Sequence, residues 1–195
     1  MRLMRTSEIA RRPVVTLAGE DVAQVKDIVY AADGGTVEGF TLAGRGLFAG
    51  PLKEGLAWDS VAALGAHAVM VRDEDALEPA ASVVERSRGA GGSSGDVLGS
   101  QVLTDAGAGL GTVHDVVVAV DPGRDGGCEV VGYEIEASEN LGTQGELVLI
   151  PLPDTMAASG EHLIVPASAK EFVGRDLAGF GAAVEAFRAQ LKGDG

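Results

Sequence analysis

One segment of the chain is written twice. The segment GTVHDVV, residues 111–117, is a near copy of AQVKDIV, residues 23–29, at an offset of 88 residues. Two further blocks repeat at offsets of 93 and 95 residues: 37–42 matches 130–135, and 59–67 matches 154–162. The offset changes only at turn-forming segments, because hairpin loops absorb added residues while strand register does not. This pattern predicts two copies of one β-module.

Hydrophobic patterning indicates that the module consists of strands. Residues 116–120 are continuously apolar, which is typical of a strand covered on both faces. Residues 129–137 alternate instead, which places Glu134 and Glu136 on one solvated face. Several short strands with close turn signals predict an all-β fold with a small barrel or sandwich in each copy.

The repeat divides the chain into four expected parts. Residues 1–85 form the first repeat, 86–95 a flexible linker, 96–175 the second repeat and 176–195 a carboxy-terminal helix. The linker is expected because its last seven residues carry no apolar side chain larger than alanine. We expect the two modules to pack as a pseudo-symmetric pair, because two small modules gain by burying apolar faces together.

The carboxy-terminal helix is predicted from Asp176 to Lys192, with Asp176 as its cap. Apolar residues recur there at steps of three and four, which places them on one helical face: Leu177, Phe180, Val184, Phe187 and Leu191. Two interpretations of this face stay open. It packs on the chain's own barrels, or it docks on a partner protein.

The charge balance limits the classes of partner. With 15 Lys and Arg against 29 Asp and Glu, the formal net charge is −14. Such a surface repels phosphates, so direct nucleic-acid binding is not expected, whereas a basic protein partner is suited to it. The only clustered cations lie near the amino terminus, where a solvated basic tail is the expected structure: Arg2, Arg5, Arg11 and Arg12.

The cellular compartment is expected to be the cytoplasm. Cys128 is the single cysteine, so no intramolecular disulfide forms. No apolar run approaches the roughly 20 residues of a membrane-spanning helix, and no secretory signal is recognised at the start.

The candidates for chemistry all have a simpler structural interpretation. Asp27 and Asp115 are equivalent across the copies, and such a carboxylate pair could share acid and base roles. Repetition of the acid in each module favours structural carboxylates that accept backbone N–H groups. The histidines His67, His114 and His162 could form an open zinc site, but they would have to converge from two modules, so turn residues are favoured.

Two further motifs are set aside. The string GGSSG, residues 91–95, matches the G-x-S-x-G pattern of hydrolases but lacks the strand and helix that a nucleophile elbow needs. Trp58 and Tyr133 occupy apolar positions and are expected in the core. No catalytic, cofactor-binding or metal-binding residue is therefore predicted.

The repeated pattern resembles the PRC-barrel family. The features that carry the resemblance are Gly-x-Val-x-Asp before an apolar strand, a turn, a strand such as VVGYEIE, and a Gly-x-His-x-apolar strand. The first copy departs at the glycine, with Ala23 where the second copy has Gly111. The resemblance covers most of residues 5–173. It implies two PRC-like barrels in tandem, each six-stranded, which serve as protein-contacting modules.

The family includes the cytoplasmic domain of the photosynthetic reaction-centre H subunit and the carboxy-terminal domain of the ribosome-maturation factor RimM. We therefore expect a non-enzymatic scaffold or adaptor without a cofactor. Its partner is another protein of unknown identity, and a homo-oligomer stays open. The alternatives are a ribosome-assembly factor that contacts a basic ribosomal protein, and an enzyme that uses Asp27, Asp115 and the histidines on a small ligand or metal.

Overall fold

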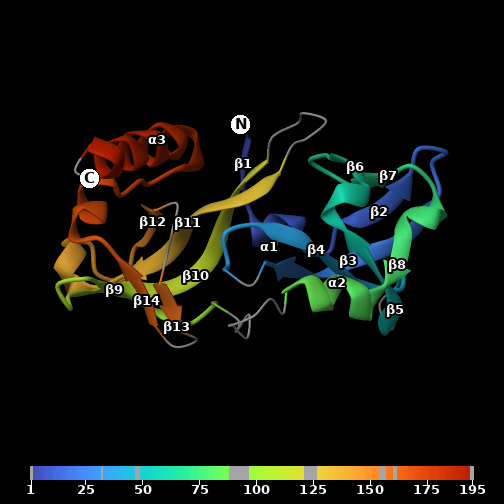
Figure 1. Cartoon of the computed structure of the whole chain (residues 1–195), viewed down its shortest axis with the longest axis horizontal. Coiled ribbons are helices and arrows are strands. Elements are labelled where there is room, and N and C mark those ends of the chain that lie inside the picture. Colours follow the sequence, from blue (N-terminus) through green and yellow to red (C-terminus); the bar gives the residue numbers. More distant parts are fainter. Residues whose placement is uncertain are drawn as a thin grey trace.

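The fold consists of two β-sheets that lie side by side, with a longer helix on the outer side of each sheet and a short helix between them (Figure 1). The computed structural model describes residues 2–31, 33–46, 49–87, 97–120, 127–153, 157–159 and 162–193. Sheet B has the strand order β6-β7-β2-β3-β4-β5-β8, and sheet A has the order β12-β11-β10-β9-β14-β13, with β1 paired to β10 in addition. The protein is thus mainly β, as expected, and it ends in a helix.

The strands of sheet B all come from the first half of the chain. They are β2 (Pro13–Thr16), β3 (Asp21–Tyr30), β4 (Val37–Ala43), β5 (Pro51–Ala57), β6 (Val61–Leu64), β7 (Val69–Val71) and β8 (Leu77–Pro79). The strands of sheet A are β1 (Arg2–Arg5), β9 (Gln101–Thr104), β10 (Gly109–Val120), β11 (Cys128–Ala137), β12 (Leu147–Pro151), β13 (Ala157–Ser159) and β14 (His162–Val165).

The two sheets repeat one topology. The path β5-β4-β3-β2-β7-β6 in sheet B corresponds strand for strand to β12-β11-β10-β9-β14-β13 in sheet A. Both copies include one parallel pair, β2 with β7 and β9 with β14, while the neighbouring pairs are antiparallel. The first turn also recurs, with Thr16 accepting from the amide of Glu20 as Thr104 accepts from that of Ala108. The predicted repeat of the sequence is therefore also a repeat of strand order.

Each sheet has a seventh strand that the expected six-stranded modules did not include. β8 extends sheet B by pairing with β5. β1 extends sheet A, because the amino-terminal residues cross to the other half and pair antiparallel with β10, Met4 opposite Val118. β10 is long enough to hold two neighbours on one edge, β9 along its first part and β1 along its second. Residues 1–85, which were expected to form the first repeat, thus contribute β1 to sheet A as well as all the strands of sheet B.

The halves also meet where the two central hairpins turn. Thr36 and Glu129 form an isolated antiparallel bridge, and the amide of Val130 donates to the carbonyl of Gly35. Thr36 and Glu129 are 93 residues apart, which is the offset between the second repeated blocks. Residues that face their own equivalents lie on a local two-fold axis, so the bridge marks a pseudo-two-fold axis between the halves.

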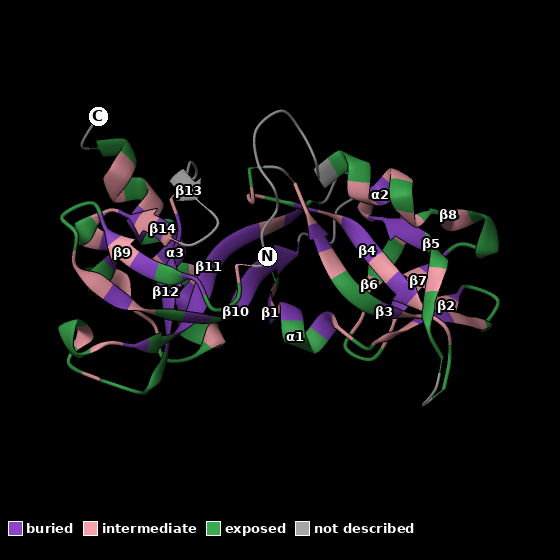
Figure 2. Cartoon of the chain, turned by 90° about the horizontal axis from the view of Figure 1, so that it is seen from below, coloured by how far each residue is buried: buried purple, intermediate pink, exposed green. Residues whose placement is uncertain are grey.

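One hydrophobic core runs through both halves (Figure 2). It joins Val14 and Phe40 of sheet B to Val113 and Ile135 of sheet A. The predicted double coverage of residues 116–120 is confirmed, because alternate residues of β10 belong to this core and to a second cluster beneath α3.

Three helices complete the structure. The helix α1 (Thr6–Ile9) follows β1 at the centre of the molecule, α2 (Ala80–Ser87) packs on β4 and β5, and α3 (Leu177–Gly193) covers the outer face of sheet A. The predicted cap of α3 is confirmed, since the carboxylate of Asp176 accepts the amide of Gly179 at 2.9 Å. Within the described ranges, no helix is long and apolar enough to span a bilayer.

The linker predicted at 86–95 overlaps the last two residues of α2, Arg86 and Ser87. Val83 of this helix is fully buried. Residues 88–96, including the GGSSG string, lie outside the described residues. Closure of either sheet into a barrel is not seen in the strand pairs formed by the described residues, where β6 and β8, and β12 and β13, are the end strands.

Candidate functional site at the junction of the two halves

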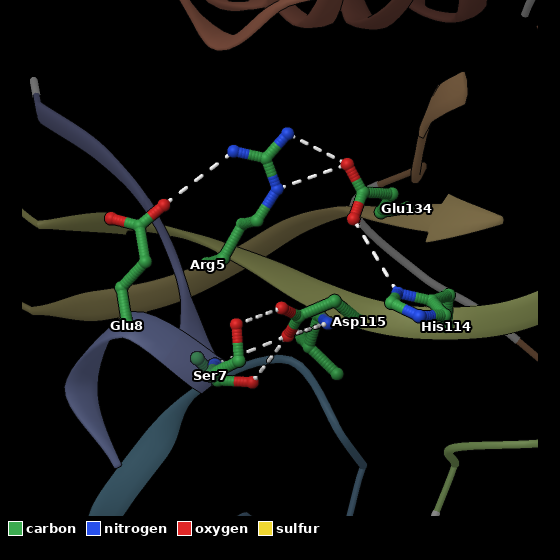
Figure 3. Close-up of polar contacts among 8 residues, drawn as sticks. Arg5, Ser7, Glu8, His114, Asp115 and Glu134 are labelled. Carbon is green, nitrogen blue, oxygen red and sulfur yellow. Dashed lines mark hydrogen bonds and ion pairs between the residues drawn. The ribbon is translucent and has the colours of Figure 1, made fainter. Parts of the chain in front are cut away.

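A group of connected polar side chains lies where β1 and α1 cross onto sheet A (Figure 3). We call it the junction cluster, and it consists of Arg5, Thr6, Ser7, His114, Asp115 and Glu134. The first three come from the amino-terminal arm, and the last three come from β10 and β11. Every contact of the arm with Asp115 and Glu134 therefore joins one half of the chain to the other.

Asp115 is the centre of the cluster. It is only 4% exposed. One carboxylate oxygen accepts the hydroxyl of Thr6 at 3.0 Å and the backbone amides of Ser7 and Val116 at 3.3 and 2.8 Å. The other oxygen accepts the hydroxyl of Ser7 in a short hydrogen bond. Asp115 thus accepts two backbone amides, and two further donors are side chains from the opposite half.

Glu134 is the second buried acid. Its Oε1 accepts from Nε and Nη2 of Arg5 at 2.9 and 2.6 Å, and its Oε2 lies 3.6 Å from Nδ1 of His114. The hydrogen bond with Glu134 raises the pKa of Arg5 above its ordinary value. The expectation that Glu134 lies on a solvated face was wrong: Arg5 covers it and leaves it 7% exposed, while Glu136 is exposed as predicted.

The amino-terminal arginines were expected to form a solvated tail, and this expectation was wrong for Arg5 and Arg12, which are partly buried, whereas Arg2 and Arg11 are exposed. Besides Arg5, Arg2 donates to the carbonyl of Leu64 at 3.3 Å, and Arg12 donates to the carbonyl of Gly65. Burial lowers the pKa of Arg12. These cations bind carbonyl and carboxylate acceptors that only the folded chain brings near them, so the basic start serves as structure.

The cluster has the groups of an acid–base site but not their arrangement. Its one serine hydroxyl donates to Asp115, whereas the imidazole of His114 is directed to Glu134 (Figure 3). A nucleophilic serine needs a base within hydrogen-bond reach that can take its proton and return it. Asp115 instead holds four donors at once, as a carboxylate that fixes backbone and arm does.

Asp27, the repeat equivalent of Asp115, has different surroundings. Its side chain is 59% exposed. Its Oδ2 accepts from Nζ of Lys26 and from the hydroxyl of Thr41, both at 2.9 Å, and the hydrogen bond with Lys26 lowers the pKa of Asp27. Thr41 stands where the second half has Glu134, at the offset of 93. The two acids thus occupy equivalent strand positions. Asp115 is covered by the amino-terminal arm, whereas Asp27 is exposed to solvent.

The three histidines lie on separate elements. His67 is exposed in the turn between β6 and β7, His162 begins β14, and His114 projects from β10. In the part of the chain that the structure describes, no group of three His, Cys, Asp or Glu is placed to hold a metal ion.

The apolar face of α3 lies against the chain itself. Phe180, Val184 and Phe187 are at most 1% exposed, and Leu177 and Leu191 are partly buried. Phe180 and Val184 pack on β10, β11 and β12, and Phe187 contacts Phe172 with ring centroids 5.4 Å apart. A shallow hollow beside Leu3 and Leu177 is lined by apolar side chains and glycine and carries no reactive group.

The aromatic residues and the cysteine are packing residues. Trp58 makes an edge contact with Phe40 at 6.1 Å, and Tyr133 is 1% exposed. Burial raises the pKa of both Tyr133 and Cys128 to about 12. A thiol with so high a pKa is a poor nucleophile at neutral pH.

Sequence reasoning missed four members of the cluster: Arg5, Thr6, Ser7 and Glu134. The available signal was the segment RLMRTS, residues 2–7, in which two apolar residues stand between arginines and are followed by two hydroxyls. That pattern is too short to reveal a strand whose partner lies more than a hundred residues away.

A known protein family matches the part of the chain from β1 to the start of β8. Residues 1–77 match the PRC-barrel domain family. No curated protein matches the chain. The matched range begins with β1, which the structure places in sheet A, and it ends at β8. The chain therefore contains one PRC-barrel domain, residues 1–77, followed by a second β-region that the family match does not include.

Proposed function

We propose that this protein is a non-enzymatic adaptor built from two PRC-barrel-like modules that binds a basic protein partner. The observation that carries the proposal is the use of Asp115 and Glu134. These are the two buried acids of the described residues, and both are saturated by contacts that hold the halves together. Carboxylates with that role stabilise the fold, and neither Asp115 nor Glu134 is then left poised for proton transfer.

The second module is proposed from the repeat. The shared strand order and the bridge between the equivalent residues Thr36 and Glu129 support a second PRC-like unit in residues 97–173. Each unit would have six strands closed as a small barrel, with β1 and β8 as additions. Closure is favoured because it removes exposed sheet edges.

The partner class follows from charge. The net charge is −14, and several cations are already engaged by the chain's own acids: Arg5 with Glu134, Arg86 with Glu78, and Arg188 with Glu129. The surface offered to a partner is thus strongly acidic. Such a surface speeds encounter with a basic protein and disfavours nucleic acid and anionic membranes.

The cytoplasm is the proposed compartment. Cys128 is buried and unpaired, and the chain has no second cysteine. A protein stabilised without disulfides suits a reducing environment.

Affinity capture with the tagged full chain tests the proposal. Extract of the source cells is applied at about 50 mM salt and eluted at about 500 mM, because screening at high salt releases partners held by charge. The expected eluate contains one or a few basic proteins, each of which binds the purified chain in isothermal titration calorimetry.

Two outcomes would argue against the proposal. One is the absence of any salt-released protein that binds the purified chain directly, and the other is a captured set without basic members. Co-sedimentation with ribosomal subunits at low salt is the outcome that favours the ribosome-assembly alternative, in which the basic partner is a ribosomal protein.

A further inference from the structure

One strand edge in sheet B lacks the neighbour that its equivalent has in sheet A. β10 pairs with β9 along its first part and then with β1, with Met4 opposite Val118 and Arg5 opposite Val117. β3 pairs with β2 up to Gln24, and the pairing continues through Val25 to Arg11 and Arg12. Beyond that point, no described residue pairs with β3 on this side. We call residues 28–31 the open edge.

The open edge has backbone groups free to accept another strand. The amide of Ala31 donates to Thr36 inside the β3–β4 hairpin. Because backbone groups alternate along a strand, the N–H and C=O of Tyr30 point to the other side, away from β4. Tyr30 is the equivalent of Val118 at the offset of 88, and Val118 is the residue that faces Met4 of β1. An unpaired edge of this kind is a template for strand addition.

The carboxylate beside the open edge is also unsealed. Asp115 receives the hydroxyls of Thr6 and Ser7 from the segment that follows β1. Asp27 stands at the same distance along β3, is 59% exposed, and has only Lys26 and Thr41 on its carboxylate among the described contacts. The pseudo-two-fold axis through Thr36 and Glu129 thus relates the part of β10 that pairs with β1 to a part of β3 that no described residue pairs with.

The sequence at the positions equivalent to the arm differs from that of the arm. At the offset of 88, the residues equivalent to RLMR at 2–5 are AGGS at 90–93. That segment has neither the apolar pair nor the cations, and Met4 of the first arm is 1% exposed in the core.

From the equivalence of these two strand edges, we propose that the open edge is a docking site for an extended segment of a basic partner protein. The segment adds as a strand antiparallel to β3, places an apolar residue opposite Tyr30, and presents Ser or Thr hydroxyls to Asp27. The arm RLMRTS, which pairs with β10 through β1, shows the sequence pattern that we expect in such a segment. Its arginines suit the acidic surface of the protein. Thr41 in place of Glu134 means that the arginine pairing at Arg5 is not reproduced, so the hydroxyls and the apolar pair carry the specificity. This inference rests on the proposed adaptor function and names its surface.

A peptide with the sequence RLMRTS is the probe for the full-length protein. Amide hydrogen exchange, followed residue by residue by NMR, is expected to show fast exchange at Tyr30 in the free chain and slowed exchange with peptide. The amide of Val118, already paired with β1, is expected to exchange slowly in both states. A peptide RSSRTS, which lacks the apolar pair, is expected to bind at least about tenfold more weakly.

The variant Asp27→Lys is expected to weaken peptide binding about tenfold, because it removes a charged acceptor and repels the arginines. Asp75→Lys is the matched control, since Asp75 is an exposed acid in the 3₁₀ turn Glu74–Ala76, away from β3, and the same charge change there is expected to alter affinity by less than about threefold. Asp27 is exposed, so the variant is expected to fold, which a thermal melt verifies.

Three results would overturn the docking site. The amide of Tyr30 could be as protected as that of Val118 in the free chain, which would mean that the chain's own residues cover the edge. Saturating peptide could leave the hydrogen-exchange rate of the Tyr30 amide unchanged. It could instead slow exchange only at amides of β10, which would mean that the peptide replaces β1 there. Asp27→Lys and Asp75→Lys could weaken binding equally. Each result would leave the adaptor function standing if basic proteins are still captured, whereas failure of capture with intact peptide binding would reject only the wider function.

Discussion

The ring of Phe180 lies directly on the backbone of Gly132, so a Cβ added at residue 132 would be 2.6 Å from Cζ of Phe180 and 2.5 Å from the carbonyl oxygen of Ile150. Gly132→Ala is therefore expected to lower the free energy of unfolding by about 2 kcal/mol or more, because a close-packed site cannot absorb a methyl group without shifting backbone. Urea denaturation measures the loss.

The first half contains the same arrangement and provides a comparison. Gly39 is the equivalent of Gly132, and a Cβ added there would lie 2.8 Å from Cγ1 of Val83 in α2 and closer still to the carbonyl oxygen of Leu56. Gly39→Ala is expected to destabilise to a similar degree. Gly193→Ala, with nothing within 4 Å of the added methyl, is the matched control and is expected to be neutral. Equal stabilities of all three variants would contradict the packing argument.

The pair Arg5 and Glu134 predicts a strong asymmetry between single and double variants. Arg5→Met leaves Glu134 buried without its cation, and it is expected to reduce stability by about 3 kcal/mol. Arg5→Met combined with Glu134→Leu is expected to recover most of that loss, because two apolar side chains replace a buried ion pair with little penalty.

Arg86→Met provides the control for that experiment, since its pair with Glu78 lies at the surface. It is expected to leave the denaturation midpoint unchanged within error. If Arg5→Met behaves like Arg86→Met, the arm does not hold the two halves together.

Arg11 predicts a stabilising substitution. It is the one described residue other than glycine with a positive φ, 69°, and its repeat equivalent at the offset of 88 is Gly99, with a φ of 83°. Arg11→Gly is expected to raise stability by about 0.5–1 kcal/mol, because glycine adopts the left-handed region without steric conflict.

The reciprocal change tests the same explanation. Gly99→Ala meets no neighbour within 4 Å, so any loss comes from backbone conformation, and about 1 kcal/mol is expected. Thermal denaturation of both variants is sufficient. A destabilised Arg11→Gly variant would show that the arginine side chain contributes more than its backbone strain removes.

Cys128 predicts a loss of stability in alkali. Burial raises the pKa of its thiol from 9.0 to about 12, so the unfolded chain releases the thiol proton first. The stability from this residue is complete below pH 9 and is lost as the pH rises toward 12. Cys128→Ala is expected to flatten the decline by up to about 1.4 kcal/mol per pH unit, and Tyr133, raised from 10.0 to about 12, accounts for part of the remaining slope. A wild-type thiol that reacts rapidly at about pH 8 in the folded state would contradict this assignment.

The repeat could be predicted from the sequence because it depends on local patterns. Apolar alternation, turn residues and offsets that change only at turns together indicated two copies of one strand pattern, in which Asp27 and Asp115 are equivalent. The cap at Asp176 and the apolar stripe of α3 are equally local, and both lie where the periodicity places them.

The crossing of β1 could not be predicted in this way. Pairing between Met4 and Val118 depends on the tertiary arrangement, and four residues carry no periodicity that names a distant partner. For the same reason Glu134 was predicted to be solvated: its alternation with Ile135 is correct for the strand, but the guanidinium that buries it comes from the other end of the chain. The helix α2 escaped notice because eight residues offer only two turns of pattern.

The antiparallel pairing of β1 with β10 also sets an order of events during synthesis. After β1 leaves the ribosome, it has no partner until Val120 has emerged, which takes roughly 6–24 seconds at about 5–20 residues per second. Until then Leu3 and Met4 remain exposed on a nascent chain that cannot complete its first domain. Premature release or a stalled ribosome would therefore produce a fragment in which β1 is unpaired and its apolar side chains are exposed, which is a substrate for chaperones and proteases.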